Sequence, residues 1–257
     1  MRYSTFKPST YFFVAVTASG PNSDALARAL RRVSAGLVTL AVLVMCLGAV
    51  QVRAQEEVPV FVEGEHYKRL PISVDTEDPA KVEVVEVFSY MCVHCYNFDP
   101  FIEAWHDMQG EGVSFRRLPA SFNADWELLA QAFYTAETLG VTEQVHEAIF
   151  SGLHNDRRDL RKSAELAALF ADQAQVAEDD FLTAYNSFSV RSRVQQAKAV
   201  TRAYQVTGVP TLVVNGKYVV DGRMAGGNVA MLQVVDQLIR EEQAAASSVS
   251  QLPVVAE

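Results

Sequence analysis

The sequence predicts an α/β fold in which a block of helices interrupts a sheet of short strands. The strands are indicated by runs rich in valine and aromatic residues. The helical block is indicated by a stretch of about 80 residues between the second and third strands, with apolar positions at helical spacing. The third observation is an Asn-Gly pair between the last two strands, which strongly favours a hairpin with a type I′ turn. The four strands are expected at 81–90, 112–118, 210–214 and 217–220.

The other elements complete this order. Residues 55–80 are a polar lead-in, and a helix should begin at Cys92, directly after the first strand. A final helix is expected at 230–243, and 244–257 are expected to form a loose, disordered tail. The inserted helices are expected at 125–139, 141–151, 163–170, 178–187 and 190–204.

Without the helical block, the order of elements is βαβ followed by ββα, which is the order of a thioredoxin-like core. We therefore predict a thioredoxin-like domain formed by 55–120 together with 204–243. The residues between them, 121–203, should form an inserted helical domain.

The first 54 residues have the pattern of a secretory signal peptide. A basic segment that ends at Arg32 precedes 15 uncharged residues, 36–50. Small or apolar side chains at Val52 and Ala54 then predict cleavage between Ala54 and Gln55. A retained membrane anchor is the alternative, although a span needs about 20 apolar residues. Export would bring the mature chain into a compartment where disulfides form.

The predicted mature chain is acidic. Residues 55–257 carry 16 basic and 30 acidic groups, a formal net charge of −14, and basic residues do not form a run with interleaved aromatics. Since the phosphate backbone would repel such a surface, the sequence argues against binding to nucleic acid.

A pair of cysteines carries the predicted chemistry. Cys92 and Cys95 lie where the helix should begin, whereas Cys46 would leave with the signal peptide. A spacing of three places both sulfurs on one helical turn, close enough to form a disulfide. The first sulfur also faces free backbone N–H groups and the positive end of the helix dipole, which stabilise a thiolate. His94 can add positive charge or a hydrogen bond, so we predict a redox-active pair.

Two other uses of a cysteine pair fit the sequence poorly. A structural zinc ion needs four ligands, and the predicted mature chain has no second cysteine pair and no closely spaced histidines. A c-type haem needs histidine directly after the second cysteine, where Tyr96 stands. We therefore predict no bound metal and no cofactor other than the cysteine pair.

Two further segments fit a redox site. Val209-Pro210 precedes a strand, and a cis bond there would expose the backbone of Val209 to an extended substrate, although a plain turn is the alternative. Glu86 lies mid-strand, where burial would raise its pKa and allow proton exchange with Cys95. The alternative for Glu86 is a partly exposed position paired with Arg116 or Arg117. We expect Glu83 to be solvated.

These residues resemble the DsbA family over most of residues 60–243. The similarity includes the strand and helix start VFSYMCVHCYNFDP. It also includes four further segments: Leu139-Gly140-Val141, Tyr185-Asn186-Ser187-Phe188, Gly208-Val209-Pro210-Thr211 and Val214-Asn215-Gly216-Lys217-Tyr218. The resemblance implies a thiol:disulfide oxidoreductase of the periplasm of a Gram-negative bacterium. Its implied substrates are reduced, unfolded secreted proteins, and its implied recycling partner is a DsbB-type, quinone-linked membrane oxidase.

The resemblance also implies roles for single residues. Cys92 would be the exposed nucleophile and Cys95 the buried resolving cysteine, while His94, Glu86 and the Val209–Pro210 loop would match the family's histidine, buried acid and cis-proline loop. Val93 departs from the family, which commonly has proline at this place. Because this dipeptide tunes the thiolate, Val93 is expected to change the reduction potential.

Two other functions remain open on the sequence. A disulfide isomerase or reductase of the same fold is the nearer one, but such isomerases carry an N-terminal dimerisation domain. Only about 27 residues precede the first strand in the predicted mature chain, too few for a domain. We therefore favour a monomer. The more distant alternative is a chaperone or binding module without redox activity.

Overall fold

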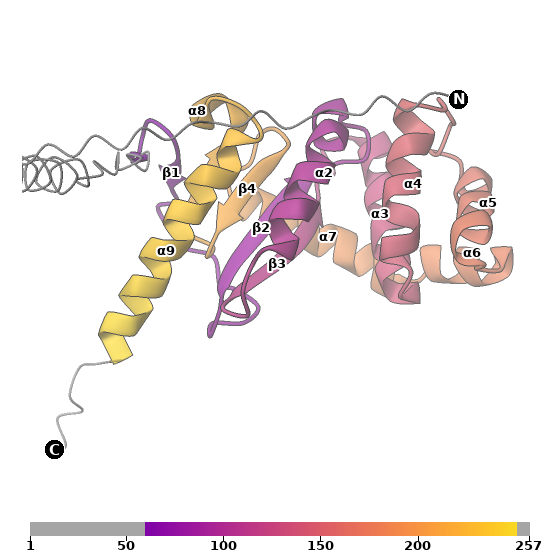
Figure 1. Cartoon of the computed structure of the whole chain (residues 1–257). Helices are drawn as coiled ribbons and strands as arrows, with labels where there is room; N and C mark the ends of the chain where they lie inside the picture. Colours follow the sequence, from indigo (N-terminus) through magenta and orange to yellow (C-terminus); the bar gives the residue numbers. More distant parts are fainter. Residues whose placement is uncertain (1–59, 251–257) are drawn as a thin grey trace, which may run out of the picture. The chain divides into compact units, whose positions relative to one another are not determined.

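The computed structural model describes residues 60–250, and the predicted signal peptide lies outside this range (Figure 1). Its centre is a five-stranded sheet with the order β1-β5-β4-β2-β3. Strands β2 and β3 are parallel, and the other neighbouring pairs are antiparallel. The strands are β1 (Lys68–Arg69), β2 (Val82–Phe88), β3 (Val113–Pro119), β4 (Thr211–Val214) and β5 (Tyr218–Asp221).

Strand β2 lies in the middle of the sheet and is buried along its whole length. Its side chains alternate between the two faces, as the period of a strand requires. Val84 packs on one face against the helices α2 (Val93–Asp107) and α9 (Ala230–Ser250), whereas Val85 and Val87 pack on the other face.

Five helices lie between β3 and β4 in the chain and supply the core of that second face. Figure 1 shows α3 to α6 grouped beside the sheet, while α2 and α9 cross its face. The helices are α3 (Ala124–Leu139), α4 (Thr142–His154), α5 (Ser163–Ala174), α6 (Glu178–Tyr185) and α7 (Phe188–Ala203). The predicted fold class, a thioredoxin-like α/β fold with an inserted helical block, is confirmed.

The hairpin between β4 and β5 follows the predicted turn chemistry. Asn215 and Gly216 both have positive φ, 51° and 61°, as a type I′ turn requires. Only glycine fits the second position, because a Cβ atom there would collide with the carbonyl oxygen of Val74. This turn also receives the lead-in segment, since the N–H of Val74 donates to the carbonyl of Gly216 at 2.9 Å.

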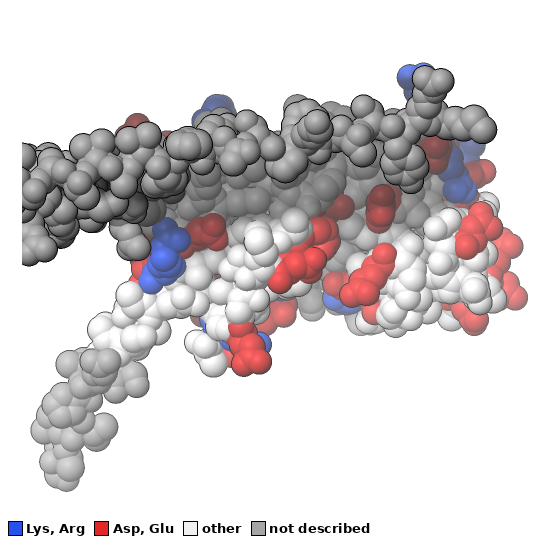
Figure 2. Space-filling model, in the orientation of Figure 1, with Lys and Arg blue, Asp and Glu red and all other residues white. Residues whose placement is uncertain are grey.

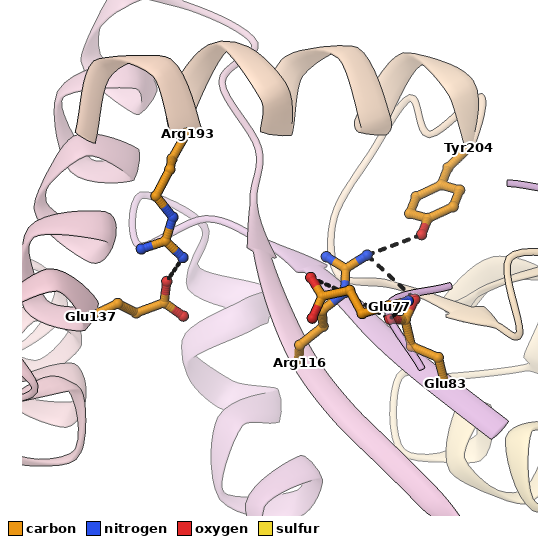
Figure 3. Close-up of polar contacts among 6 residues, drawn as sticks. All are labelled: Glu77, Glu83, Arg116, Glu137, Arg193 and Tyr204. Carbon is orange, nitrogen blue, oxygen red and sulfur yellow. Dashed lines mark hydrogen bonds and ion pairs between the residues drawn. The ribbon is translucent and has the colours of Figure 1, made fainter. Parts of the chain in front are cut away.

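A hydrogen bond from an ion-paired arginine of the sheet reaches the end of the helical block (Figure 3). Arg116 on β3 donates to Glu83 at 3.1 Å and to the hydroxyl of Tyr204, which follows α7. Farther along α7, Arg193 pairs with Glu137 of α3. The expectation that Glu83 is solvated was wrong: it is 1 % exposed. Its position at the start of a strand suggested water, but α7 and Arg116 cover that end of the sheet.

Three local features differ from the prediction. Strand β1 and the short helix α8 (Gly222–Ala225) were not predicted, because two or four residues are too short to show a period. The expected loose tail from 244 onward was wrong as far as 250, since α9 continues to Ser250. The run Gln243-Ala244-Ala245-Ala246 favours helix strongly, which explains the extension. Residues 251–257 lie outside the described range.

Within residues 60–250, no helix combines the length and the apolar character that crossing a membrane requires.

Candidate active site

The cysteine pair lies at the edge of the sheet where β2 ends. Cys92 is the N-cap of α2, with an extended backbone (φ −94°, ψ 112°), so the helix begins where the sequence predicted. Its sulfur accepts a hydrogen bond from the backbone N–H of Cys95 at 3.4 Å. Cys92 is partly exposed and Cys95 is buried. An incoming group therefore reaches the sulfur of Cys92 first.

The pKa values of the two thiols are shifted in opposite directions. A hydrogen bond donated by the thiol of Cys95 lowers the pKa of Cys92 to about 6, against partial burial, which raises it. The backbone N–H groups of Cys95 and His94 and the charge of His94 lower it further. Burial is the main cause that raises the pKa of Cys95 far above that of an ordinary thiol, and the neighbouring Cys92 and Glu86 add to it. The dithiol thus loses its first proton from Cys92.

We expect alkylation of the reduced protein to show this difference. The rate of reaction with iodoacetamide should rise with a midpoint near pH 6, because only the thiolate of Cys92 reacts. Mass spectrometry should find the label on Cys92 alone. In a His94→Ala variant the midpoint should move upward. A midpoint near pH 9 in the unmodified protein would contradict the proposed stabilisation of the thiolate.

The loop before β4 lies against Cys92. The peptide bond between Val209 and Pro210 is cis, as predicted, and the thiol of Cys92 donates to the carbonyl oxygen of Val209 at 3.6 Å. The loop and His94 line the same groove, which has a volume of about 360 Å³. Backbone groups beside a reactive sulfur offer hydrogen bonds to an extended peptide.

Glu86 lies beneath the pair, on β2. It is 1 % exposed, and Arg117 of β3 donates to its carboxylate at 3.0 Å. Burial raises the pKa of Glu86 to about 7, although the charge of Arg117 opposes the shift. The sequence left open burial or pairing with an arginine, and the structure has both. A carboxyl group with this pKa can hold or release a proton near neutral pH.

Arg117 extends this contact into a larger network that sequence reasoning missed. Its guanidinium also donates to Asp99 at 3.0 Å and to Glu103 at 2.5 Å, both on α2. His146 of α4 lies between Asp99, at 3.1 Å, and the hydroxyl of Tyr90, at 2.7 Å. Burial lowers the pKa of His146. Spacing of Asp99 and Glu103 by four residues placed them on one helical face, but the sequence considered Arg117 only as a possible partner of Glu86.

Asp99, Glu103 and His146 also lie close enough together to share a metal ion, with ligand atoms within 4.8 Å of one another. The guanidinium of Arg117 already supplies a positive charge to both carboxylates. The cluster is therefore better described as part of the ion-pair network than as a metal centre.

The cysteine pair on this sheet has the arrangement of a redox-active site. A thioredoxin-like sheet places two cysteines at the start of a helix, with an acidic thiol outside and a buried one behind it. Such a pair alternates between dithiol and disulfide and exchanges disulfides with other thiols.

Comparison with known proteins identifies the family. The profile of the "DSBA-like thioredoxin domain" matches residues 102–239. The thiol:disulfide interchange protein DsbA of Azotobacter vinelandii is 46% identical over 182 residues, which cover 71% of this chain and 85% of the relative. The crystal structure of Pseudomonas aeruginosa DsbA is 42% identical, with a TM-score of 0.70, and covers 73% of this chain and 97% of that one. A third match is the structure of the oxidoreductase DsbA from Xylella fastidiosa, with 34% identity, a TM-score of 0.67, and coverage of 73% and 99%.

The chain belongs to the DsbA family and is a thiol:disulfide oxidoreductase. The family assignment agrees with the resemblance seen in the sequence. The matched profile begins after the cysteine pair, at residue 102, so the roles of single residues depend on the geometry described above.

Proposed function

We propose that the chain donates a disulfide between Cys92 and Cys95 to reduced, unfolded secreted proteins. A substrate thiolate attacks the sulfur of Cys92, the bond between the two cysteines breaks, and Cys95 leaves. A second substrate thiolate then attacks the substrate sulfur of this mixed disulfide and releases the thiolate of Cys92. The substrate loses two electrons and gains a disulfide, while the pair becomes a dithiol.

The observation that supports disulfide donation is the difference between the two thiols: the pKa of Cys92 is lowered and that of Cys95 is raised. Because the pKa of Cys92 is about 6, its thiolate is a good leaving group in the second step. The same stabilisation favours the reduced pair, and so makes the disulfide a stronger oxidant. Val93, the first residue of α2 and half exposed, replaces the proline that is common in the family and is proposed to tune this potential.

Glu86 and the Val209–Pro210 loop have supporting roles in this proposal. Cys95 has a high pKa and needs a proton as it leaves, and Glu86, with a pKa of about 7, can deliver one. The backbone of Val209 lies beside Cys92 and can pair with an extended substrate next to its cysteine. His94 supplies its backbone N–H and its charge to the thiolate.

The cellular setting follows from the same proposal. We place the mature chain, after cleavage near Ala54, in the periplasm of a Gram-negative bacterium, as a monomer with a thioredoxin-like domain and an inserted helical domain. A DsbB-type, quinone-linked membrane oxidase would return the dithiol to the disulfide. The reaction needs no cofactor other than the cysteine pair, because the electrons stay on sulfur.

Oxidative refolding tests the function. A reduced, unfolded protein whose activity needs disulfides is mixed with one equivalent of the oxidised chain, and free thiols and recovered activity are followed. Thiols should disappear within seconds to minutes. The matched control is the same chain, reduced and alkylated at its cysteines, which should leave the substrate thiols unchanged. Equal rates with the two preparations would exclude disulfide donation.

The same assay separates an oxidase from an isomerase. A substrate with scrambled disulfides has no thiols left to oxidise, so a disulfide donor should recover little of its activity. Rapid recovery from the scrambled protein by the reduced chain, with slow oxidation of the reduced protein, would support an isomerase instead. Recovery by the alkylated chain would support a chaperone.

A further inference from the structure

The groove beside Cys92 continues along one edge of the sheet. Strand β2 ends there, β4 begins there after Pro210, and β5 ends there at Asp221, because β4 is antiparallel to both neighbours. Strand β1 adds Lys68, which pairs with Val219 of β5. An extended peptide with its cysteine at Cys92 would therefore pass the Val209 loop and then the ends of β5 and β1.

Positive charge lines the far part of this groove. Lys68 and Arg223 both line it, and both are exposed. Side chains of directly paired residues lie on the same face of an antiparallel pair, so Lys68 lies on the face of Val219, which also lines the groove. Neither cation forms an ion pair with another residue of the 60–250 range.

The other charged groups of the groove have partners within the protein. Asp221 caps α8, and its carboxylate accepts hydrogen bonds from the N–H groups of Arg223 and Met224 at 3.0 Å each. Arg69 donates to Glu63 at 3.3 Å and to the hydroxyl of Tyr218 at 2.8 Å. Apart from His94, which lies beside Cys92 and acts on its thiolate, Lys68 and Arg223 are therefore the basic groups of the groove that remain available to a ligand.

This local charge is opposite to that of the rest of the chain. Residues 55–257 carry a formal net charge of −14. Figure 2 shows acidic side chains spread over α2 and the helical block on the face in view, with few basic ones among them. A cationic groove on an acidic protein attracts an acidic segment locally, while the remaining surface repels acidic proteins in general.

We propose that the groove selects extended polypeptide substrates that carry Asp or Glu within a few residues of the reacting cysteine. The carboxylates would contact Lys68 and Arg223 while the backbone pairs with Val209 and the cysteine reaches Cys92. This inference rests on the proposed function, because the occupant of the groove is taken to be the substrate that Cys92 oxidises.

Single-turnover oxidation of short peptides tests the proposal. Three peptides with two cysteines each differ only in the flanking residues, which are Asp, Asn or Lys. The preoxidised chain should oxidise the Asp peptide about threefold to tenfold faster than the Asn peptide at low salt, and the Lys peptide more slowly than the Asn peptide. At about 1 M salt, where the screening length is about 3 Å, the three rates should converge.

Flanking charges also change the pKa of a peptide's own thiols and so could change its rate without any contact with the groove. Charge-reversal variants of the protein distinguish these two effects. Lys68→Glu with Arg223→Glu should invert the ratio of Asp to Lys rates relative to the unmodified chain. Lys68→Gln with Arg223→Gln should bring the ratio to an intermediate value. Lys81→Glu is the matched control, because Lys81 is exposed at the opposite end of β2 and should leave the ratio unchanged.

The outcomes distinguish the two proposals. Rapid oxidation of all three peptides with a ratio that the groove variants do not change would overturn the substrate preference and leave disulfide donation intact. The same would follow if Lys81→Glu changed the ratio as much as the groove variants. Failure to oxidise any peptide would overturn disulfide donation, and the substrate preference with it.

Discussion

Replacing Cys95 by serine is expected to abolish disulfide donation and to leave Cys92 able to form long-lived mixed disulfides. Without the second sulfur, no disulfide exists within the pair, so net oxidation of a reduced protein should fall by at least about a thousandfold. Cys92 keeps its place at the N-cap of α2 and most of its backbone hydrogen bonds. Attack by its thiolate on an oxidised substrate then stops at the mixed disulfide.

The measurement combines refolding with gel electrophoresis under non-reducing conditions. The Cys95→Ser variant should form an adduct that reductant removes, whereas Cys92→Ser should be equally inactive and form little adduct. This asymmetry follows from exposure and acidity, because Cys95 is buried and its pKa is strongly raised. More adduct with Cys92→Ser than with Cys95→Ser would show that the two roles are reversed.

Replacing Arg117 by methionine is expected to destabilise the protein by about 3–5 kcal/mol, the usual cost of leaving a buried charge without its partner. Arg117 is 11 % exposed and contacts Glu86 at 3.0 Å, Asp99 at 3.0 Å and Glu103 at 2.5 Å. Its loss leaves the carboxylate of Glu86 in the core. Urea unfolding of the oxidised forms measures the effect without titration of Cys92.

The loss of stability should depend on pH. The pKa of Glu86 is raised from 4.5 to about 7 in the folded protein, so folding favours its protonated form. The stability from this group is fully present below about pH 4.5 and is lost as the pH rises to 7. Removing the positive charge of Arg117 raises this pKa further. Both proteins should therefore lose stability in parallel up to about pH 7. Above that pH the unmodified protein levels off while the variant continues to weaken, so the difference between them should grow.

Two further variants test whether the loss of stability in Arg117→Met comes from the unpaired carboxylate of Glu86. A second substitution, Glu86→Leu, removes the unpaired carboxylate and should restore much of the lost stability, since apolar residues can replace a buried ion pair at little cost. Arg161 lies in an exposed ion-pair cluster, with its side chain 47% exposed, and Arg161→Met should change stability little. Equal destabilisation by Arg117→Met at pH 4.5 and pH 8 would contradict the linkage to Glu86.

Local patterns were enough to predict most of the elements and the place of the cysteine pair. Valine-rich runs predicted the strands, and apolar residues at helical spacing predicted the inserted helices. Asn215-Gly216 predicted the hairpin turn, in which the structure has φ values of 51° and 61°. Cys92 at the start of α2 follows from the same order of strand and helix. The limit of α9 was missed because an alanine-rich extension carries no apolar period.

The partners of the buried charges were decided only by the tertiary structure. Glu86 and Arg117 are 31 residues apart in the chain, and the parallel register of β2 and β3 places them side by side. The contacts of the buried Glu83 also come from distant segments: Arg116 of β3 donates to its carboxylate, and the same guanidinium donates to Tyr204, which follows α7.

The α/β fold, its helical insertion and the cysteine pair at a helix start could all be predicted from the amino-acid sequence. Those properties depend on residues that are neighbours in the chain. The spacing of apolar residues along a strand or a helix therefore predicts them directly. The tertiary structure decided that Val209 lies beside Cys92, that Arg117 joins Glu86 to α2, and that Lys68 lines the same edge. These contacts join segments far apart in sequence, so they exist only once the sheet is assembled.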